Sequence, residues 1–295
     1  MEKSISGYTK LAGVIAKPIK HSLSPLIHNT GYRALTIDAV YLAFEVEETE
    51  FDQALDAVKT FDMLGVNLSM PYKQKGYDRC DTLSESAKLI GVVNTIVQRN
   101  GQFHGYNTDG IGFIESLIDE GISINNQTLT ILGAGGAAKA VICQCALDGI
   151  KEINVFKRNN HSFNHVQKEL ADISTQTNTV INVFDYADKK LMEDIISKSD
   201  ILVNATQIGM GDNFDLPIGD NVKLTEQHVV VDLIYHPLET PLLKLARAND
   251  AVVINGLGML VHQAAYAFEL MTQEKMPIKI ISERLIEELN DKERE

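Results

Sequence analysis

The sequence contains no tryptophan, only 7 prolines and only 3 cysteines in 295 residues. With 44% hydrophobic residues and few prolines, it lacks the character of a disordered or fibrous chain. Cys80, Cys143 and Cys145 form no C-x-x-C pair, and an odd count offers no disulfide framework. We therefore expect a reducing, cytoplasmic location.

Long apolar runs and clustered metal ligands are also missing. The run Leu11–Ala16 is shorter than a signal-peptide core, and no other stretch approaches the length that spans a membrane, so no membrane partner is expected. His161 and His165 lie one helical turn apart without further ligands, and Cys143 and Cys145 point to different faces of their helix. We expect no metal.

Positive charge is the scarcer sign. Lys and Arg number 27 against 40 Asp and Glu, which gives a formal net charge of −13. Such a field repels nucleic acid, so we expect no nucleic-acid partner. An anionic small molecule must be drawn in by local cations, which makes Lys73, Lys157 and Arg158 of interest.

The sequence does contain apolar, β-branched runs that alternate with helical stretches, the pattern of parallel sheets with crossover helices. The length favours two modest domains over one large core. A first series predicts strands at Leu11–Ala16, Val40–Val46, Gly65–Ser69 and Asn94–Gln98, with helices near Pro25–Leu35 and Glu48–Thr60. The dipeptide Asn100-Gly101 predicts a tight hairpin.

A second series predicts about six strands, as expected of a doubly wound dinucleotide-binding fold. The strands are Thr128–Leu132, Ile153–Phe156, Thr179–Phe184, Ile201–Asn204, Val229–Asp232 and Val252–Asn255, with helices at Ala137–Leu147, Lys189–Lys198 and Pro241–Ala248. Further helices are predicted at Thr108–Gly121, Met259–Met271 and Ile278–Leu289. The predicted fold class is α/β: a substrate-binding catalytic domain over residues 1–112 plus 259–295, and a Rossmann-like domain over residues 113–258.

A glycine-rich turn opens the second series. Gly133-Ala134-Gly135-Gly136-Ala137 follows a predicted strand and begins a predicted helix, so its N–H groups and helix dipole are expected to face a pyrophosphate. Gly133 permits the turn, and Gly135 lets the backbone approach the phosphates. Gly136 and Ala137 are expected to let the helix pack closely on the strand. A glycine turn without a ligand is the plainer alternative.

The end of the next strand bears on the cofactor. An acidic residue there suits the ribose of NAD, whereas basic residues suit the phosphate of NADP. The residues present are Lys157-Arg158-Asn159-Asn160. The two cations could take a phosphate and the two amides could bind ribose hydroxyls, so the loop predicts a cofactor contact and leaves NAD and NADP both open.

Polar residues gather where the strands of the first domain end. The segments are His21–Pro25, Asn67–Lys73, Val93–Thr95 and Tyr106–Gly110, whose hydroxyls, amides, ammonium and carboxylate suit a polyhydroxylated acid. With these segments the chain closely resembles the shikimate dehydrogenase family. Together with Gly256–Leu260, these segments are specific to that family, and the resemblance covers nearly the whole chain.

The resemblance implies a reversible, NAD(P)-linked reduction of 3-dehydroshikimate to shikimate in aromatic amino-acid biosynthesis. It implies that Lys73 gives and takes the proton while Asp109 hydrogen-bonds the reacting hydroxyl and the ammonium. The remaining residues that it implies are Ser22, Ser24 and Tyr235 for the carboxylate, Ser69, Asn94 and Gln263 for ring hydroxyls, and Leu233 and Gly256 for the cofactor.

These residues have plainer interpretations too. Ser24 is a good candidate N-cap of the helix that begins near Pro25, and Asp109 could simply cap the connecting helix. Lys73 could be a surface lysine and Gln263 a solvated helix residue, although the Gly258 turn shortly before Gln263 favours a ligand.

Three departures from the family pattern keep details open. Ser69 stands where most relatives carry Thr, Lys157 replaces an Asn, and the basic residue that ends the cofactor-loop motif is missing. The chain looks more like the quinate/shikimate branch, which accepts NAD or NADP and quinate besides shikimate. The oligomeric state, a homodimer included, stays open.

Two other functions fit parts of the pattern. A non-catalytic sensor of quinate or shikimate would keep both pockets but could spare Lys73 or Asp109, and both are present. A two-domain dehydrogenase acting on folates would not explain the segments around Ser22, Ser24 and Asp109.

Overall fold

The computed structural model describes residues 4–219 and 221–292. Of these, residues 4–112 and 261–292 form one compact unit, here unit 1, and residues 113–260 apart from 220 form another, unit 2. In the described part of the chain each unit contains a six-stranded sheet. The chain passes between the units within two helices, α5 (Asp109–Asp119) and α10 (Gly256–Thr272).

The sheet of unit 1 is mixed. Its strands are β1 (Lys10–Ala16), β2 (Ala39–Glu45), β3 (Gly65–Leu68), β4 (Thr82–Leu83), β5 (Thr95–Arg99) and β6 (Gln102–Tyr106), in the order β2-β1-β3-β5-β6-β4. β1 runs parallel to β2 and β3, whereas β5 is antiparallel to β3 and β6. The predicted hairpin is confirmed: Asn100 and Gly101 join β5 to β6 with φ angles of 52° and 75°.

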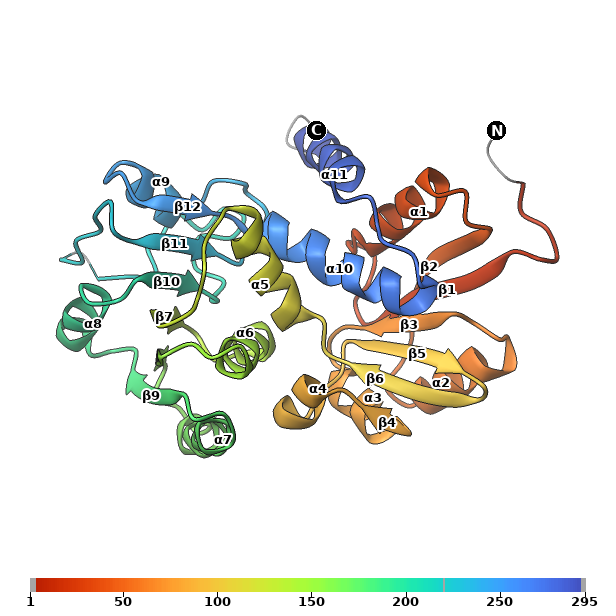
Figure 1. Cartoon of the computed structure of the whole chain (residues 1–295), viewed down its shortest axis with the longest axis horizontal. Coiled ribbons are helices and arrows are strands. Elements are labelled where there is room, and N and C mark those ends of the chain that lie inside the picture. Colours follow the sequence, from red (N-terminus) through yellow and green to blue (C-terminus); the bar gives the residue numbers. More distant parts are fainter. Residues whose placement is uncertain (1–3, 220, 293–295) are drawn as a thin grey trace. The chain divides into compact units, whose positions relative to one another are not determined.

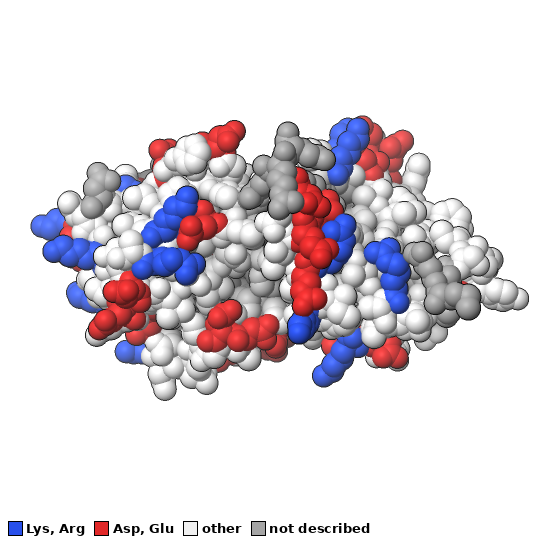
Figure 2. Space-filling view, turned by 90° about the horizontal axis from the view of Figure 1, so that it is seen from above, with Lys and Arg blue, Asp and Glu red and all other residues white. Residues whose placement is uncertain are grey.

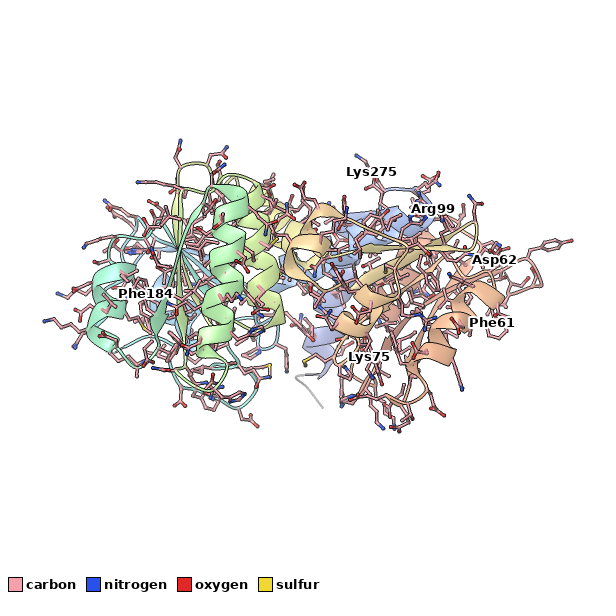
Figure 3. The ribbon with its side chains drawn as sticks, turned by 90° about the horizontal axis from the view of Figure 1, so that it is seen from below. Phe61, Asp62, Lys75, Arg99, Phe184 and Lys275 are labelled. Atoms are coloured by element: carbon pink, nitrogen blue, oxygen red, sulfur yellow. The ribbon has the colours of Figure 1, made fainter. Side chains whose placement is uncertain are left out.

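Helices cover both faces of this sheet (Figure 1). One face carries α1 (Ser24–Ala34), the end of α10 and α11 (Ile278–Lys292), and the other carries α2 (Phe51–Thr60), α3 (Lys73–Asp78) and α4 (Glu85–Ile90). On the second side Phe51 and Leu55 pack with Ile96 and Phe103 in a buried core. Arg99, labelled in Figure 3, donates to the carbonyl of Leu270 at 2.9 Å and so ties the hairpin to α10.

The face under α1 contains a buried aromatic cluster. The His28 ring stacks on Tyr41 with centroids 4.1 Å apart, and Tyr32 lies against Phe268 of α10 at 5.2 Å. His28 Nδ1 and the Tyr32 hydroxyl are buried and have no hydrogen-bond partner within the described residues. Burial lowers the pKa of His28 to about 3, because the charged imidazolium would lose its hydration.

The sheet of unit 2 is wholly parallel. Its strands are β7 (Thr128–Leu132), β8 (Glu152–Lys157), β9 (Val180–Asp185), β10 (Ile201–Asn204), β11 (Val229–Asp232) and β12 (Val252–Ile254), in the order β12-β11-β10-β7-β8-β9. This is the doubly wound order, which confirms the predicted fold class. The order reverses between β7 and β10, and ligands of such sheets bind outside the carboxyl ends of the strands at this switch point.

The crossover helices of unit 2 are α6 (Gly136–Leu147), α7 (Phe163–Thr177), α8 (Lys189–Ile196) and α9 (Pro241–Arg247). The helix α7 was not among the predicted elements. It buries Val166, Leu170 and Ile173, which recur at helical spacing. Phe184 of β9, labelled in Figure 3, packs on Phe156 with centroids 5.4 Å apart.

Two helix boundaries differ from prediction. The helix expected from Met259 begins at Gly256, so Gly256 and Gly258 lie inside α10 and not in a turn before it. The helix expected from Glu48 begins at Phe51.

The surface is mixed in charge. Figure 2 shows acidic and basic side chains interspersed on the face that it presents, with uncharged areas between them. Among the described residues, no helix combines the length and the apolar character that crossing a bilayer requires.

Candidate active site

In unit 1 four polar segments meet at one edge of the sheet. β1 and β3 are parallel neighbours, so their carboxyl ends, followed by residues 17–24 and 69–73, share an edge. β5 runs back from that edge and β6 returns to it, because each is antiparallel to its neighbour. The segments that precede β5 and follow β6, at Asn94 and Asp109, therefore belong to the same edge.

Lys73 and Asp109 form an ion pair there. Lys73 is the first residue of α3 and Asp109 the first of α5, and Lys73 Nζ lies 2.5 Å from Asp109 Oδ2. Their side chains are 24% and 14% exposed, so the pair is largely desolvated and still reachable. A lysine and a carboxylate in this setting can exchange a proton with a bound molecule and stabilise the charge that develops.

The simpler role of Asp109 as a helix cap is not observed. Its second carboxylate oxygen, Oδ1, accepts a hydrogen bond from Asn94 Nδ2 at 2.7 Å. The two oxygens thus face Lys73 and Asn94, and the Asp109 backbone N–H is bonded to Asn107 Oδ1 at 3.2 Å.

Asn94 is buried beneath this pair, and its carboxamide is fully engaged. Besides Asp109, Nδ2 donates to Thr108 Oγ1 at 3.0 Å. Oδ1 accepts from the Thr108 backbone N–H at 2.8 Å and from the Thr95 hydroxyl at 3.1 Å. A ring hydroxyl could bind Asn94 only in exchange for one of these bonds.

The candidate serines differ in their surroundings. The expectation that Ser24 caps a helix is wrong: α1 has Leu23 at its N-cap and no side-chain cap bond. The Ser24 backbone N–H instead bonds to Ser22 Oγ at 3.3 Å. The Ser69 hydroxyl has no hydrogen-bond partner within the described residues. The Ser22 and Ser69 hydroxyls can therefore donate to a ligand, whereas the Ser24 side chain is hydrogen-bonded to Tyr41.

Two further candidates lie on other elements. Gln263 is partly buried on α10 in unit 1. Tyr235 follows β11 in unit 2 and is 37% exposed, and burial of part of its ring raises the pKa of its hydroxyl.

In unit 2 the glycine turn lies at the switch point. Gly133 has φ 102°, and a Cβ there would come within 2.9 Å of the Ala205 carbonyl oxygen that follows β10. Only glycine can both adopt this positive φ and leave room for the carbonyl oxygen. Gly135 is the N-cap of α6, and the next residue begins the helix.

One part of the prediction for this turn is wrong. Gly136 and Ala137 are predicted to let the helix pack closely on the strand, but both are exposed, and a Cβ on Gly136 would meet nothing within 4 Å. Ala138 and Ala140 are the buried residues of this turn of helix. The backbone N–H groups at Gly135 and Gly136 are therefore open to a phosphate, which fits a dinucleotide at the start of a helix.

The loop after β8 exposes the cation of Arg158 and buries that of Lys157. Lys157 is buried, and its Nζ donates to Asn160 Oδ1 at 2.7 Å and to the Arg158 carbonyl at 3.1 Å. Desolvation lowers the pKa of Lys157, with smaller contributions from the neighbouring cations Arg158 and Lys139. Lys157 thus braces the loop, while Arg158, Asn159 and Asn160 are exposed.

A buried carboxylate that the sequence did not single out organises the loop after β11. Asp232 accepts hydrogen bonds from Asn204 Nδ2 at 3.1 Å, from the Thr240 hydroxyl at 2.7 Å and from the Ile234 N–H at 3.1 Å. Desolvation raises its pKa, which these donors partly offset. The available signal was an acidic residue at the carboxyl end of a strand at the ligand edge.

Gly256 packs against the same loop. Its N–H bonds to the Ile234 carbonyl at 3.0 Å, and a Cβ on Gly256 would lie 2.2 Å from the Leu233 carbonyl oxygen. The first turn of α10 and the loop after β11 can approach this closely only because residue 256 has no side chain. Leu233 and Gly256 are thus adjacent.

Comparisons with known proteins agree with this arrangement. The model of the shikimate dehydrogenase substrate binding domain matches residues 14–96, and that of the shikimate 5'-dehydrogenase C-terminal domain matches residues 256–286. A shikimate dehydrogenase (NADP(+)) of Streptococcus suis is 44% identical over 290 residues, 98% of this chain and 100% of that protein. This chain belongs to the shikimate dehydrogenase family.

Other members of the shikimate dehydrogenase family also match nearly the whole chain. A shikimate dehydrogenase (NADP(+)) of Streptococcus sanguinis is 48% identical over 92% of this chain and 95% of its own length. The crystal structure of shikimate 5-dehydrogenase from Listeria monocytogenes in complex with shikimate and NAD is 38% identical, with a TM-score of 0.93 over 97% of this chain and 99% of that one. The family resemblance drawn from the motifs is therefore confirmed.

Proposed function

We propose that this protein is a shikimate dehydrogenase that interconverts 3-dehydroshikimate and shikimate with NAD or NADP. The observation that carries the proposal is the partly buried Lys73–Asp109 pair, 2.5 Å apart at the polar edge of unit 1. It supplies the proton-transfer group that reduction of a ring ketone needs. A sensor without catalysis has no use for such a pair.

The roles of the pair follow from its chemistry. In reduction, the Lys73 ammonium donates a proton to the carbonyl oxygen while Asp109 stabilises the transferring charge. In oxidation, the neutral Lys73 amine takes the hydroxyl proton. A bound nicotinamide dinucleotide supplies or accepts the hydride.

The substrate contacts that we propose come from polar side chains of unit 1 and from Tyr235 of unit 2. Ser22, Ser24 and Tyr235 would bind the carboxylate, and Ser69 and Gln263 ring hydroxyls. Asn94 joins them only indirectly, since its carboxamide already holds Asp109.

The cofactor contacts that we propose combine the exposed start of α6 with the loop after β8. The stretch Gly133–Ala137 would bind the pyrophosphate through backbone N–H groups. Arg158, Asn159 and Asn160 would face the adenosine ribose, with Lys157 bracing them from inside. Leu233 and Gly256 would bind the remainder of the cofactor.

A direct assay tests the proposed function. The purified full-length chain should reduce NAD or NADP when supplied with shikimate, followed at the absorbance of the reduced nicotinamide, and the reverse reaction should proceed with 3-dehydroshikimate. Comparison of kcat/KM for both cofactors, first with shikimate and then with quinate, ranks the four pairs. Absence of turnover with every pair would exclude the assignment.

Arg158 should matter more for NADP than for NAD. Charge-assisted hydrogen bonds to a phosphate contribute about 1.5–3 kcal/mol, so Arg158→Gln is expected to raise KM for NADP about ten- to hundredfold. The KM for NAD should change about threefold at most, because NAD carries no phosphate on its adenosine ribose for Arg158 to bind. Lys151→Gln, which removes an exposed cation of the same unit, controls for net charge. Equal losses for both cofactors would show that Arg158 does not read the phosphate.

A reducing cytoplasm is the compartment that we propose. Cys143 and Cys145 are buried in α6 and Cys80 is partly buried, and none of the three forms a disulfide within the described residues. Such thiols persist in a reducing environment.

A further inference from the structure

A directed chain of hydrogen bonds runs through unit 1 to the catalytic pair. The Tyr41 hydroxyl donates to Asn67 Oδ1 at 2.6 Å, and Asn67 Nδ2 donates to Thr95 Oγ1 at 2.9 Å. Thr95 Oγ1 donates to Asn94 Oδ1 at 3.1 Å, and Asn94 Nδ2 donates to Asp109 Oδ1 at 2.7 Å. Four successive bonds thus connect Tyr41 to Asp109.

The four residues that lead to Asp109 are shielded from water. Tyr41 and Thr95 are fully buried, Asn94 is 3% exposed and Asn67 is 8% exposed. In such surroundings a polar atom without a partner is costly, and water cannot replace a lost bond. Each group therefore holds its neighbour in one orientation.

The direction of the chain is fixed at both carboxamides. Asn67 Oδ1 can only accept, so the Tyr41 hydroxyl must donate to it. Asn94 Oδ1 accepts from the Thr95 hydroxyl and from the Thr108 backbone N–H at 2.8 Å. A flipped Asn94 would point its N–H groups at these donors and its oxygen at the Asp109 carboxylate, which would repel it.

We infer that Tyr41, Asn67 and Thr95 are positioning residues for proton transfer: they lock the Asn94 carboxamide so that it presents only N–H to Asp109. This inference rests on the proposed function. None of the three needs to touch substrate. With Asn94 Nδ2 on one oxygen and Lys73 Nζ on the other, Asp109 is held where it orients the Lys73 ammonium.

The sharpest test changes one atom in the middle of the chain. Thr95→Val keeps the shape of the side chain and removes the hydroxyl, whereas Thr95→Ser keeps the hydroxyl. We expect Thr95→Val to lower kcat about tenfold, since two buried partners lose their bond. The KM for shikimate should stay within about twofold, because no substrate contact is lost. Thr95→Ser should retain most of the wild-type kcat.

A second pair of variants tests the far end of the chain. Tyr41→Phe removes the first donor, and Tyr32→Phe is its matched control. Tyr32 belongs to the same aromatic cluster, is equally buried, and its hydroxyl has no partner within the described residues. Tyr41→Phe should lower kcat in the same direction as Thr95→Val, and Tyr32→Phe should leave it unchanged.

A spectroscopic readout separates positioning from a loss of folded protein. In the 15N-labelled full chain, the Asn94 side-chain N–H groups should exchange with solvent at least about tenfold faster in Thr95→Val and Tyr41→Phe than in wild type. The spectrum needs no turnover, so it decides the inference even if the wild-type chain fails to oxidise shikimate. That failure would refute only the proposed function. Unchanged exchange and unchanged kcat in both variants would overturn the inference.

Discussion

Replacing Lys73 with alanine should lower kcat at least about a hundredfold, because a general acid and base contributes roughly 10²- to 10⁴-fold. The KM for shikimate should stay within about threefold, since the residue acts mainly in the transition state. Lys73→Arg should be almost as poor as alanine. A guanidinium keeps the charge beside Asp109 but does not release its proton at neutral pH.

Lys75 provides the matched control for this prediction. Lys75, labelled in Figure 3, lies two residues further along α3, is exposed, and pairs with Glu48 at 3.2 Å. Exposed ion pairs contribute little, so Lys75→Ala should turn over like wild type. Steady-state rates in both directions give the comparison. Wild-type turnover by Lys73→Ala, or equal losses in the two variants, would remove Lys73 from the proposed mechanism.

Gly256→Ala should have the largest effect in unit 2. The added methyl carbon would lie 2.2 Å from the Leu233 carbonyl oxygen, 2.5 Å from its carbon and 2.9 Å from the Ile234 carbonyl carbon. All three are backbone atoms, so the start of α10 and the loop after β11 must separate. Overpacking of this kind costs about 1–3 kcal/mol, and a displacement near 1 Å at a binding loop can lower kcat/KM about a hundredfold.

Thermal unfolding with and without cofactor, together with kcat/KM for the cofactor, measures both effects of Gly256→Ala. Gly219→Ala is the control in the same unit, because its methyl would meet only the flexible side chain of Lys189 at 3.6 Å. If Gly256→Ala binds cofactor and melts as wild type does, the close approach is not required.

The sequence predicted the layered fold well because the strands are short, apolar and β-branched. The run Val229–Asp232 is buried almost throughout, and its predicted bounds are those of β11. The hairpin at Asn100-Gly101 was predictable because few residues other than Asn and Gly adopt positive φ at both positions. These signals lie within the few residues of each element, which is why short buried strands and tight hairpins can be predicted from the sequence.

The errors arose where a distant part of the chain decides the local structure. Two glycines near residue 257 predict a turn, yet both lie inside α10, and residue 256 is glycine because the Leu233 carbonyl leaves no room for a side chain. Gly136 was expected to pack on a strand, and no local signal shows that the space beside it is open. The helix α7 was missed although Val166, Leu170 and Ile173 carry the periodicity, because polar residues surround them.

In the candidate site, too, the contacts that the sequence did not predict join distant parts of the chain. Lys73 and Asp109 are 36 positions apart, and only the family resemblance predicts that they act together. Tyr41 and Asn67 are 26 positions apart, and although Asn67 opens one of the polar segments, nothing in the sequence links it to Tyr41. Pairings of this range depend on the strand order of the sheet, which sequence periodicity does not contain.

Buried His28, whose Nδ1 has no hydrogen-bond partner within the described residues, has a consequence for acid tolerance. Its ordinary pKa of 6.5 falls to about 3 in the folded chain, so between these values the unfolded chain binds a proton that the folded chain excludes. Stability therefore falls as pH drops through this window, by up to about 1.4 kcal/mol per pH unit from this one site. Urea unfolding of His28→Phe, which keeps the stacked ring but cannot be protonated, should show a shallower acid dependence. Unfolding below neutral pH thus takes up a proton at His28. Lowering the pH therefore shifts the folding equilibrium toward the unfolded state.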